Sequence, residues 1–199
     1  MRAARHLLLR DDSPAPPTTL LRDTFARANS AVALGTCDTG QVWTALTGTW
    51  GVDTNMGYRP GITATDCVAS IDVGASWLSY EVIVFANPEF PGVAFDITDS
   101  NNFYAVLVNN SLRRLELYKR VSGTYTSIAV SASTIFTAFA DLTIKVVRSG
   151  SSKAIQLAGT PVISLTDSSL SVTNKVGFRL QTGLGTNTSR WKDITVMSP

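Results

Sequence analysis

The chain has few of the side chains on which nucleophilic and metal-dependent catalysis depend. Its 199 residues include one histidine, two cysteines and three glutamates. The histidine, His6, lies close to the N-terminus, which excludes a Ser-His-Asp or Cys-His arrangement and a histidine-rich metal site in the rest of the chain. No Gly-x-Gly-x-x-Gly or phosphate-binding loop follows a strand-like run, and the stretch 183–187 is typical of a surface loop. We therefore expect no metal, nucleotide or other cofactor.

The two cysteines, Cys37 and Cys67, are too few for a disulfide framework or for a zinc site built from sulfur alone. A single bridge between them is one interpretation. The other is a pair of unbridged thiols, since cysteine is also a common small buried side chain. We favour the unbridged thiols.

The net charge of the chain is also small. Seventeen basic and fifteen acidic residues leave a formal net charge of +2 at pH 7. That excess is too small for the counterion release on which a dedicated DNA- or RNA-binding protein depends. The densest basic run, Arg113, Arg114, Lys119 and Arg120, alternates with apolar residues, which is typical of the solvent-facing side of a strand. We therefore exclude nucleic acid as a partner.

Long hydrophobic runs are absent from the sequence. No stretch approaches the roughly 20 apolar residues needed to cross a bilayer. Near the N-terminus, three leucines stand between His6 and Arg10, far fewer than the about seven or more apolar residues of a secretory signal. We therefore expect no membrane segment and no signal peptide, which counts against a secreted cellular lectin.

What the sequence does contain, from residue 21 onward, is short runs of β-branched and aromatic residues separated by Gly, Asn, Asp, Ser and Pro. This pattern is typical of antiparallel sandwiches and jelly rolls. Hydrophobic residues make up 44% of the chain, which is enough for a sizeable core in one domain. Eleven runs are predicted to be strands of two stacked sheets: Cys67 to Val73, Trp77 to Ala86, Gly92 to Thr98, Phe103 to Val108, Leu112 to Val121, Tyr125 to Val130, Leu142 to Arg148, Lys153 to Leu157, Val162 to Leu165, Val176 to Gln181 and Trp191 to Val196.

Alternation within these runs predicts which side chains face the core. Leu115 and Leu117 alternate with Glu116 and Tyr118, so we expect the leucines to point inward and the other two to point outward. The same alternation separates Phe178 and Leu180 from Arg179 and Gln181.

Two runs are apolar on both faces, namely Trp77 to Ala86 and Phe103 to Val108. They are predicted to be central strands whose outer sides are covered by loops or by a neighbouring subunit. Helix signals are nearly absent, and the exception, Ser133 to Ala140, has the pattern of a single helical turn.

A set of short phrases is distributed over residues 21 to 197. They are Asp23-Thr24-Phe25, Gly40-Gln41-Val42-Trp43, Thr47-Gly48-Thr49-Trp50, Asp99-Ser100-Asn101-Asn102-Phe103-Tyr104, Leu115-Glu116-Leu117-Tyr118-Lys119 before Gly123, and Trp191-Lys192-Asp193-Ile194-Thr195-Val196. Together these phrases resemble the concanavalin A-like sandwich domains found in bacteriophage minor tail proteins and other virion proteins.

The resemblance implies an all-β fold, a two-sheet antiparallel jelly-roll sandwich over residues 21–199. It also implies a non-enzymatic virion protein, either a minor tail protein or a surface decoration protein, assembled in the host cytoplasm. The sandwich would then serve a structural role or adhere to cell-surface polysaccharide, while a capsid head fibre or decoration protein without a ligand is an alternative. Many copies of a weak site would act through avidity, and we expect a homo-oligomer.

Residues 1–20 differ in composition from the rest and are predicted to be an N-terminal arm. Prolines at 14, 16 and 17 favour extended backbone, so residues 11–19 are predicted to be a semi-rigid spacer. Apolar anchors flanked by charges precede it, and they are expected to bind other virion proteins. The alternative is a short helix that folds back on its own sandwich. The predicted anchoring residues are Arg5, Leu7, Leu8, Leu9 and Arg10.

A glycan site would require an exposed aromatic ring for the apolar face of a sugar and polar groups for its hydroxyls. Packing in the core is the competing explanation for every large aromatic residue. Trp43 and Trp50 are predicted to pack against the first and last strands. The candidate glycan-binding residues are Trp77, Tyr104, Tyr118 and Trp191.

Sandwiches of the resembled kind include laminarinase-like glycoside hydrolases, which use paired carboxylates in a Glu-x-Asp-x-x-Glu type motif. None of the three glutamates here has a carboxylate two residues away, so we expect no enzyme. An alternative is a glycan-active hydrolase in which the distant carboxylates Asp72, Glu81 and Asp96 converge in the fold.

The acidic and amide-bearing stretch Asp96 to Asn102 has two interpretations. Its oxygens could be ligands for calcium, although the stretch lacks the regular alternation of a calcium loop. Asp, Ser and Asn also bond to the backbone of turns, so we favour an ordinary hairpin connection.

Overall fold

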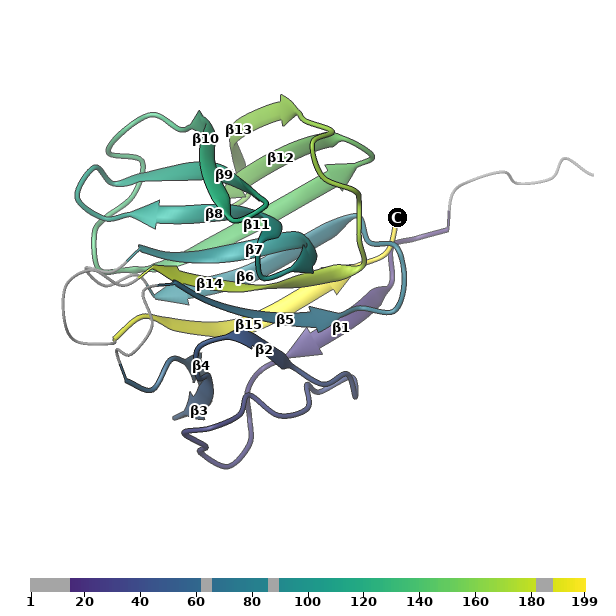
Figure 1. Cartoon of the computed structure of the whole chain (residues 1–199), viewed down its shortest axis with the longest axis vertical. Coiled ribbons are helices and arrows are strands. Elements are labelled where there is room, and N and C mark those ends of the chain that lie inside the picture. The colour runs from purple at the N-terminus through teal and green to yellow at the C-terminus, as the bar shows by residue number, and fades with distance from the viewer. Residues whose placement is uncertain (1–14, 62–65, 86–89, 182–187) are drawn as a thin grey trace, which may run out of the picture.

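The computed structural model describes residues 15–61, 66–85, 90–181 and 188–199. Within these residues the chain forms fifteen strands and no helix, and hence no helix that could span a membrane. The strands form two antiparallel sheets that are stacked face to face, and in Figure 1 the two sheets overlap in projection. The predicted all-β, two-sheet sandwich is confirmed.

The larger sheet contains eight of the described strands. Its order is β13-β12-β11-β6-β15-β4-β3, and β1 pairs with β15 outside this order. The strands are β1 (Thr19–Asp23), β3 (Gly51–Asp53), β4 (Met56–Tyr58), β6 (Ser79–Phe85), β11 (Asp141–Ser149), β12 (Ser152–Leu157), β13 (Thr160–Thr166) and β15 (Arg190–Met197).

The other sheet contains the remaining seven described strands in the order β10-β9-β8-β7-β14-β5-β2. The long hairpins β7–β8 and β9–β10 supply four neighbouring strands of this sheet. The strands are β2 (Thr44–Thr47), β5 (Asp66–Asp72), β7 (Phe90–Asp99), β8 (Asn102–Asn109), β9 (Arg114–Val121), β10 (Thr124–Val130) and β14 (Lys175–Gln181).

The core lies between the sheets and follows the predicted alternation. Leu115 and Leu117 of β9 belong to it, whereas Glu116 and Tyr118 face away from the other sheet. Both runs that are apolar on two faces, β6 and β8, are internal strands, as predicted. Because side chains alternate along each strand, the seven-stranded sheet has one set of apolar residues in the core and a second set on its outer face.

An aromatic cluster closes the core beside the first and last strands. The Trp43 indole Nε1 donates a hydrogen bond of 2.7 Å to Asp23 at the end of β1. Trp50 packs edge-on against Trp191 of β15, with ring centroids 5.2 Å apart. Trp50 therefore packs against the last strand, as predicted, whereas Trp43 bonds to β1, which was not among the predicted strands.

Residues 133–140, predicted to form a helical turn, form turns and bends instead. The amides of Thr134 and Ile135 donate to the carbonyls of Leu112 and Arg113 in the β8–β9 turn. Because these donors are used by another segment, they are not available for the local bonds of a helical turn. The prediction for this segment was wrong.

The two cysteines of the chain, Cys37 and Cys67, are both buried thiols without a bridge between them. Cys67 lies in β5, where burial raises the pKa of its thiol. The prediction of unbridged thiols is confirmed.

Candidate functional site

The outer face of the seven-stranded sheet is covered, although it faces away from the other sheet. The six apolar residues of this face form a second hydrophobic cluster in which no residue is more than 4% exposed. Tyr118 and Tyr125 pack on the cluster from outside and are themselves half-buried. The members of this outer cluster are Val68, Ala94, Ile97, Phe103, Ala105 and Leu107.

Two hairpin tips fold over this face. The register of β7 against β8 is interrupted between Phe95 and Asp99, and Asp96 in this bulge has a φ of 50°. A bulge bends its strand, and this one lies just before the tip. The tip of β9–β10 binds the tip of β7–β8, since the Gly123 amide donates to the Asn101 carbonyl at 3.0 Å. Figure 1 shows β10 running across the direction of β8 and β9.

A single carboxylate holds these tips to the far side of the sheet. Asp66, the first residue of β5, accepts hydrogen bonds from Arg120 Nη1 at 2.7 Å and from the Tyr125 hydroxyl at 2.7 Å through Oδ2. Its Oδ1 accepts from Arg179 Nε at 3.0 Å. We call Asp66, Arg120, Tyr125 and Arg179 the Asp66 cluster. Its members come from β5, β9, β10 and β14.

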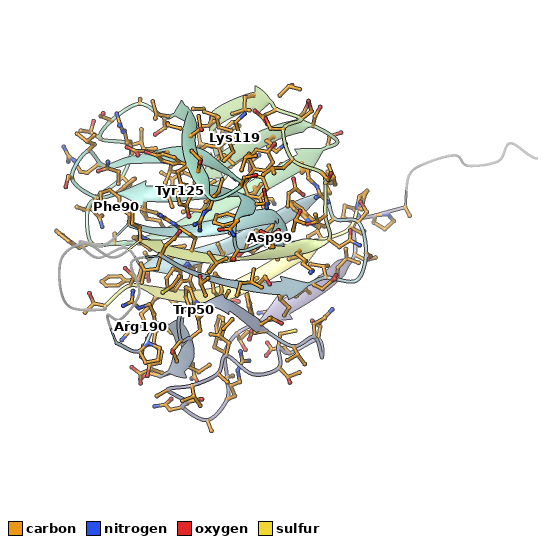
Figure 2. All side chains as sticks on the ribbon, viewed as in Figure 1. Trp50, Phe90, Asp99, Lys119, Tyr125 and Arg190 are labelled. Atoms are coloured by element: carbon orange, nitrogen blue, oxygen red, sulfur yellow. The ribbon has the colours of Figure 1, made fainter. Side chains whose placement is uncertain are left out.

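The Asp66 cluster shows how strongly the sheet is curled. Four strands lie between β10 and β5 in the sheet order, so in a flat sheet their backbones would be about 24 Å apart at about 4.8 Å per strand. The side chains of Tyr125 and Asp66 nevertheless touch. In Figure 2, Tyr125 lies between Phe90 and Asp99, the two ends of β7, over the middle of the sheet.

Two guanidinium groups contact the Tyr125 ring. The Arg120 and Arg179 guanidinium carbons lie 5.0 Å and 4.8 Å from its centroid. Such contacts stabilise a ring by cation–π attraction. Burial, together with the charge of Asp66, raises the pKa of Tyr125 to about 12, against the effect of Arg179. The hydroxyl is therefore a proton donor to Asp66 at neutral pH.

A hollow of about 170 Å³ opens beside this ring. It lies over the register row in which Arg179 faces Gly92 and Gly92 faces Leu107. A Cβ at position 92 would stand 2.5 Å from the Val106 carbonyl oxygen and 2.7 Å from the Leu107 side chain, so the row needs glycine there. The hollow is lined by Leu107, Tyr118, Tyr125, Arg179 and Gln181.

Glu116 lies beside the hollow and orients Tyr118. Its Oε2 accepts from the Tyr118 hydroxyl at 3.0 Å, and its Oε1 accepts from Arg114 Nε at 2.7 Å and from Asn109 Nδ2 at 2.9 Å. Burial raises the pKa of Glu116, but the bonds from Arg114, Asn109 and Tyr118 outweigh it, so the net shift is downward. The carboxylate is therefore ionised and accepts all three bonds at neutral pH.

The four candidate glycan-binding residues are not brought together. Trp77, Tyr104 and Trp191 are enclosed in the core, where the Trp191 indole donates to the Gly92 carbonyl at 3.0 Å. Tyr118 alone lines the hollow. The predicted anchoring residues Arg5, Leu7, Leu8, Leu9 and Arg10 lie outside the described residues.

Sequence reasoning did not select five residues of the site, although it had assigned two of them to the outer face. Arg179 and Gln181 alternate with core residues, which was a usable signal. Tyr125 stood in a predicted strand without further mark, and Asp66 is 54 to 113 residues away from its partners, so no local pattern relates them. The five residues are Asp66, Leu107, Tyr125, Arg179 and Gln181.

The carboxylates of the alternative hydrolase do not converge. Asp72 bonds the amide of Gly74 in a turn, and Glu81 lies on the outer face of the eight-stranded sheet, 3.7 Å from Lys145. Asp96 is inside the sandwich and pairs with Arg148 of the opposite sheet. Three carboxylates in three separate environments give no acid and nucleophile pair.

The stretch from Asp96 to Asn102 is the bulge and tip of the β7–β8 hairpin. Asp99 accepts from the Asn101 amide at 2.7 Å and from the Asn102 side chain at 3.0 Å, which is the turn bonding expected of these residues. The hairpin interpretation is confirmed. Among the described residues, no three His, Cys, Asp or Glu side chains gather as metal ligands would.

No protein-family model matches the chain, and no curated protein matches it. Its fold is nevertheless shared by solved structures with names related to glycans. The carbohydrate-binding module CBM66 from Bacillus subtilis is 20% identical, with a TM-score of 0.55, and the match covers 78% of this chain and 91% of that one. The Ca²⁺-bound exoplasmic/lumenal domain of VIP36 is 10% identical, with a TM-score of 0.59 over 91% and 90% of the two chains.

Porphyranase B from Zobellia galactanivorans, an enzyme, also shares the fold, with 9% identity, a TM-score of 0.56 and 99% of each chain covered. At these identities the comparisons establish the fold alone. The chain therefore has a β-sandwich fold that occurs in proteins with different functions, among them a carbohydrate-binding module and a porphyranase.

Proposed function

We propose that this chain is a non-catalytic carbohydrate-binding domain whose site is the hollow lined by Tyr118 and Tyr125. The observation that carries the proposal is the placing of two half-buried tyrosine rings, a guanidinium and an amide around one hollow on an otherwise covered sheet face. Glycan-related proteins with the same fold support the proposal.

The chemistry of the hollow suits a sugar. Aromatic rings pack against the apolar C–H face of a saccharide, while charged and amide side chains bond its hydroxyls. Tyr118 and Tyr125 supply the rings, and Arg179 and Gln181 supply a donor and a mixed donor–acceptor group. Leu107 forms an apolar floor. The site therefore offers both kinds of contact that a polyhydroxylated ring requires.

The carboxylates beside the site support binding rather than hydrolysis. Asp66 accepts three hydrogen bonds and Glu116 accepts three, all from side chains of the same sheet. A general acid needs a proton at neutral pH, which requires a raised pKa, whereas the pKa of Glu116 is lowered. These two groups therefore hold the binding side chains in place.

The proposal is tested by titrating the full chain against an array of immobilised polysaccharides and bacterial cell walls, with free sugar as competitor. Tyr118→Ala removes one ring of the hollow and should weaken the saturable binding at least tenfold, because stacking on an aromatic ring is lost. Tyr58→Ala, a half-buried tyrosine of the other sheet, is the matched control and should bind as the original chain does. Equal loss in both variants would contradict the assignment of the site.

The resemblance of the sequence to phage sandwich domains extends the proposal to a virion surface, as part of a minor tail or decoration protein. On this proposal residues 1–20 bind other virion proteins, and the chain is displayed in several copies. One structural observation favours this arrangement, because Pro17 lines a hollow on the outer face of the eight-stranded sheet, opposite the face that carries Tyr118 and Tyr125. An anchor there leaves the sugar site pointing away. Immunogold labelling of purified particles is the test, and unlabelled particles would contradict the virion role.

A further inference from the structure

The shape of the hollow narrows the class of glycan, and this inference rests on the proposed function. We infer that the site takes the terminal residue of a glycan chain, which enters end-on, and does not take an internal stretch of polysaccharide lying along the sheet. Three observations support this inference: the volume of the hollow, the burial of the residues around it, and the hydrogen bonds that hold Tyr118 and Tyr125 in place.

The hollow holds about one ring. Its volume is about 170 Å³, the space of about six water molecules at about 30 Å³ each. Pockets that enclose larger organic ligands run from about 300 Å³ upward. A run of several sugar rings therefore does not fit within it.

Along the described strands β5, β7, β8 and β14, the sheet beside the hollow offers no continuation. One register position along from Leu107 on this face is Ala105, paired with Ala94, and both are fully buried. Val68, which faces Arg179 across the strand pair β5–β14, is also fully buried. A polysaccharide lying along the face would need these positions to be open, but the side chains of the outer cluster and of the hairpin tips already fill the space above them.

The walls are fixed rather than loosely closed. On one side, Tyr125 is tied to Asp66 through its hydroxyl and is flanked by Arg120 and Arg179. Arg120 also donates to the Ser100 carbonyl at 2.8 Å, which joins the β9–β10 hairpin to the β7–β8 tip. To open this wall, a ligand would have to break several bonds to a charged carboxylate at once, each among the stronger hydrogen bonds in proteins.

The part of the wall formed by Tyr118 is fixed in the same way. The Tyr118 ring meets Tyr125 edge-on, with centroids 6.3 Å apart, and its hydroxyl donates to Glu116. Gln181, at the end of β14, is exposed. A sugar that enters past Gln181 meets two tyrosine rings and the Leu107 floor, so one end of the ring stays outside and can carry the rest of the chain.

The outer face of the eight-stranded sheet shows what an open site for a chain would look like. It carries a shallow hollow of about 440 Å³ over β11, β12 and β13, and a neighbouring one of about 360 Å³ that shares Val147 with it. Neither is lined by an aromatic ring among the described residues. Of these three hollows, only the smallest is lined by tyrosine rings.

The experiment compares equal masses of the same glycan before and after its chain ends are multiplied. Yeast-type mannan, galactan and a laminarin-type β-glucan are each immobilised as the intact polymer and after graded partial hydrolysis, and the chain ends are counted by reducing-sugar assay. The full chain is titrated to saturation on each. If the site takes termini, doubling the number of chain ends doubles the protein bound per gram, and Tyr118→Ala removes this binding while Tyr58→Ala retains it.

The outcomes separate the inference from the proposed function. Saturable binding that is constant per gram, or that falls as the chains are shortened, overturns end-on recognition and leaves carbohydrate binding standing. Binding that rises with chain ends but is unaffected by Tyr118→Ala overturns the assignment to this hollow. If none of the probes is bound in either form, the proposed function fails and the inference fails with it.

Discussion

The outer faces of the two sheets differ in how far their charged residues are buried. On the eight-stranded sheet, charged residues form partly exposed pairs, Glu81 with Lys145 at 3.7 Å and Asp141 with Lys192 at 2.6 Å. On the seven-stranded sheet, the charged residues Asp66, Arg120 and Arg179 are drawn together over a second apolar cluster. Charged side chains on the outer face of the eight-stranded sheet are therefore more exposed to solvent than those on the outer face of the seven-stranded sheet.

The difference comes from curvature rather than from the strand pattern, since both sheets alternate inward and outward side chains. Pairs in contact with solvent, such as Glu81 and Lys145, contribute about 0–1 kcal/mol to the free energy of unfolding. A buried charge costs several kcal/mol when its partner is removed. Side chains of the same types are therefore expected to differ greatly in importance according to the sheet that carries them.

The largest expected effect comes from removing the carboxylate that joins the members of the Asp66 cluster. Asp66→Ala removes the carboxylate that accepts hydrogen bonds from Arg120, Tyr125 and Arg179. The side chain of Arg179 is only 2% exposed, so its charge would stay buried without this partner. We expect the free energy of unfolding to fall by ~3 kcal/mol, as for a buried ion pair broken from one side. Urea unfolding followed by tryptophan fluorescence measures it, and a loss under ~1 kcal/mol would show that the cluster is not a buried pair in energetic terms.

A smaller effect is expected from Tyr125→Phe, which keeps the ring and removes the hydroxyl. The lost bond to Asp66 is expected to cost ~1.5 kcal/mol at pH 7. Tyrosine in the unfolded chain has a pKa of about 10, whereas that of Tyr125 is raised to about 12. Stability from this shift is present below pH 10 and is lost as pH rises through about 12, because the unfolded chain releases the proton first.

The measurement for Tyr125→Phe is the melting temperature between pH 8 and pH 11.5. The variant should lose less stability over this range than the original chain does. If the two curves stay parallel, Tyr125 does not hold its proton more tightly in the folded state.

The smallest expected effect comes from removing a carboxylate on the outer face of the eight-stranded sheet, as the counterpart of Asp66→Ala. Glu81→Ala removes the acidic partner of Lys145, whose side chain is 33% exposed, and should change the free energy of unfolding by less than ~0.5 kcal/mol. It is the control for Asp66→Ala under the same urea titration. If Glu81→Ala lowers the free energy of unfolding as much as Asp66→Ala does, charged residues on the two faces do not differ in their contribution to stability.

Much of the sandwich followed from the sequence because it depends on local patterns. All eleven predicted strands are present, and alternation placed Leu115, Leu117, Arg179 and Gln181 on the correct faces. The strands β1, β2, β3 and β4 were not predicted. They are three to five residues long, and polar residues or glycine occupy half or more of β2, β3 and β1, so they carry no periodic signal.

The candidate site followed from the sequence only in part. Tyr118 was selected, but the choice of Trp77, Tyr104 and Trp191 beside it came from residue type, and a large aromatic ring fits a core as well as it fits a sugar. The closing of the covered face depends on the bulge at Asp96 and on contacts to Asp66 across four intervening strands. Curvature of this kind is a property of the whole sheet, and no short window of sequence encodes it.

The pairing of β1 with β15 sets a condition on biosynthesis. The Ser198 amide donates to the Thr18 carbonyl at 2.9 Å, so residues at opposite ends of the described chain lie side by side, and β15 separates β6 from β1 and β4. A ribosome releases the N-terminal strand long before residues 190–197 have been made. During that interval, the larger sheet has a gap where β15 belongs, with two unpaired edges exposed to neighbouring nascent chains.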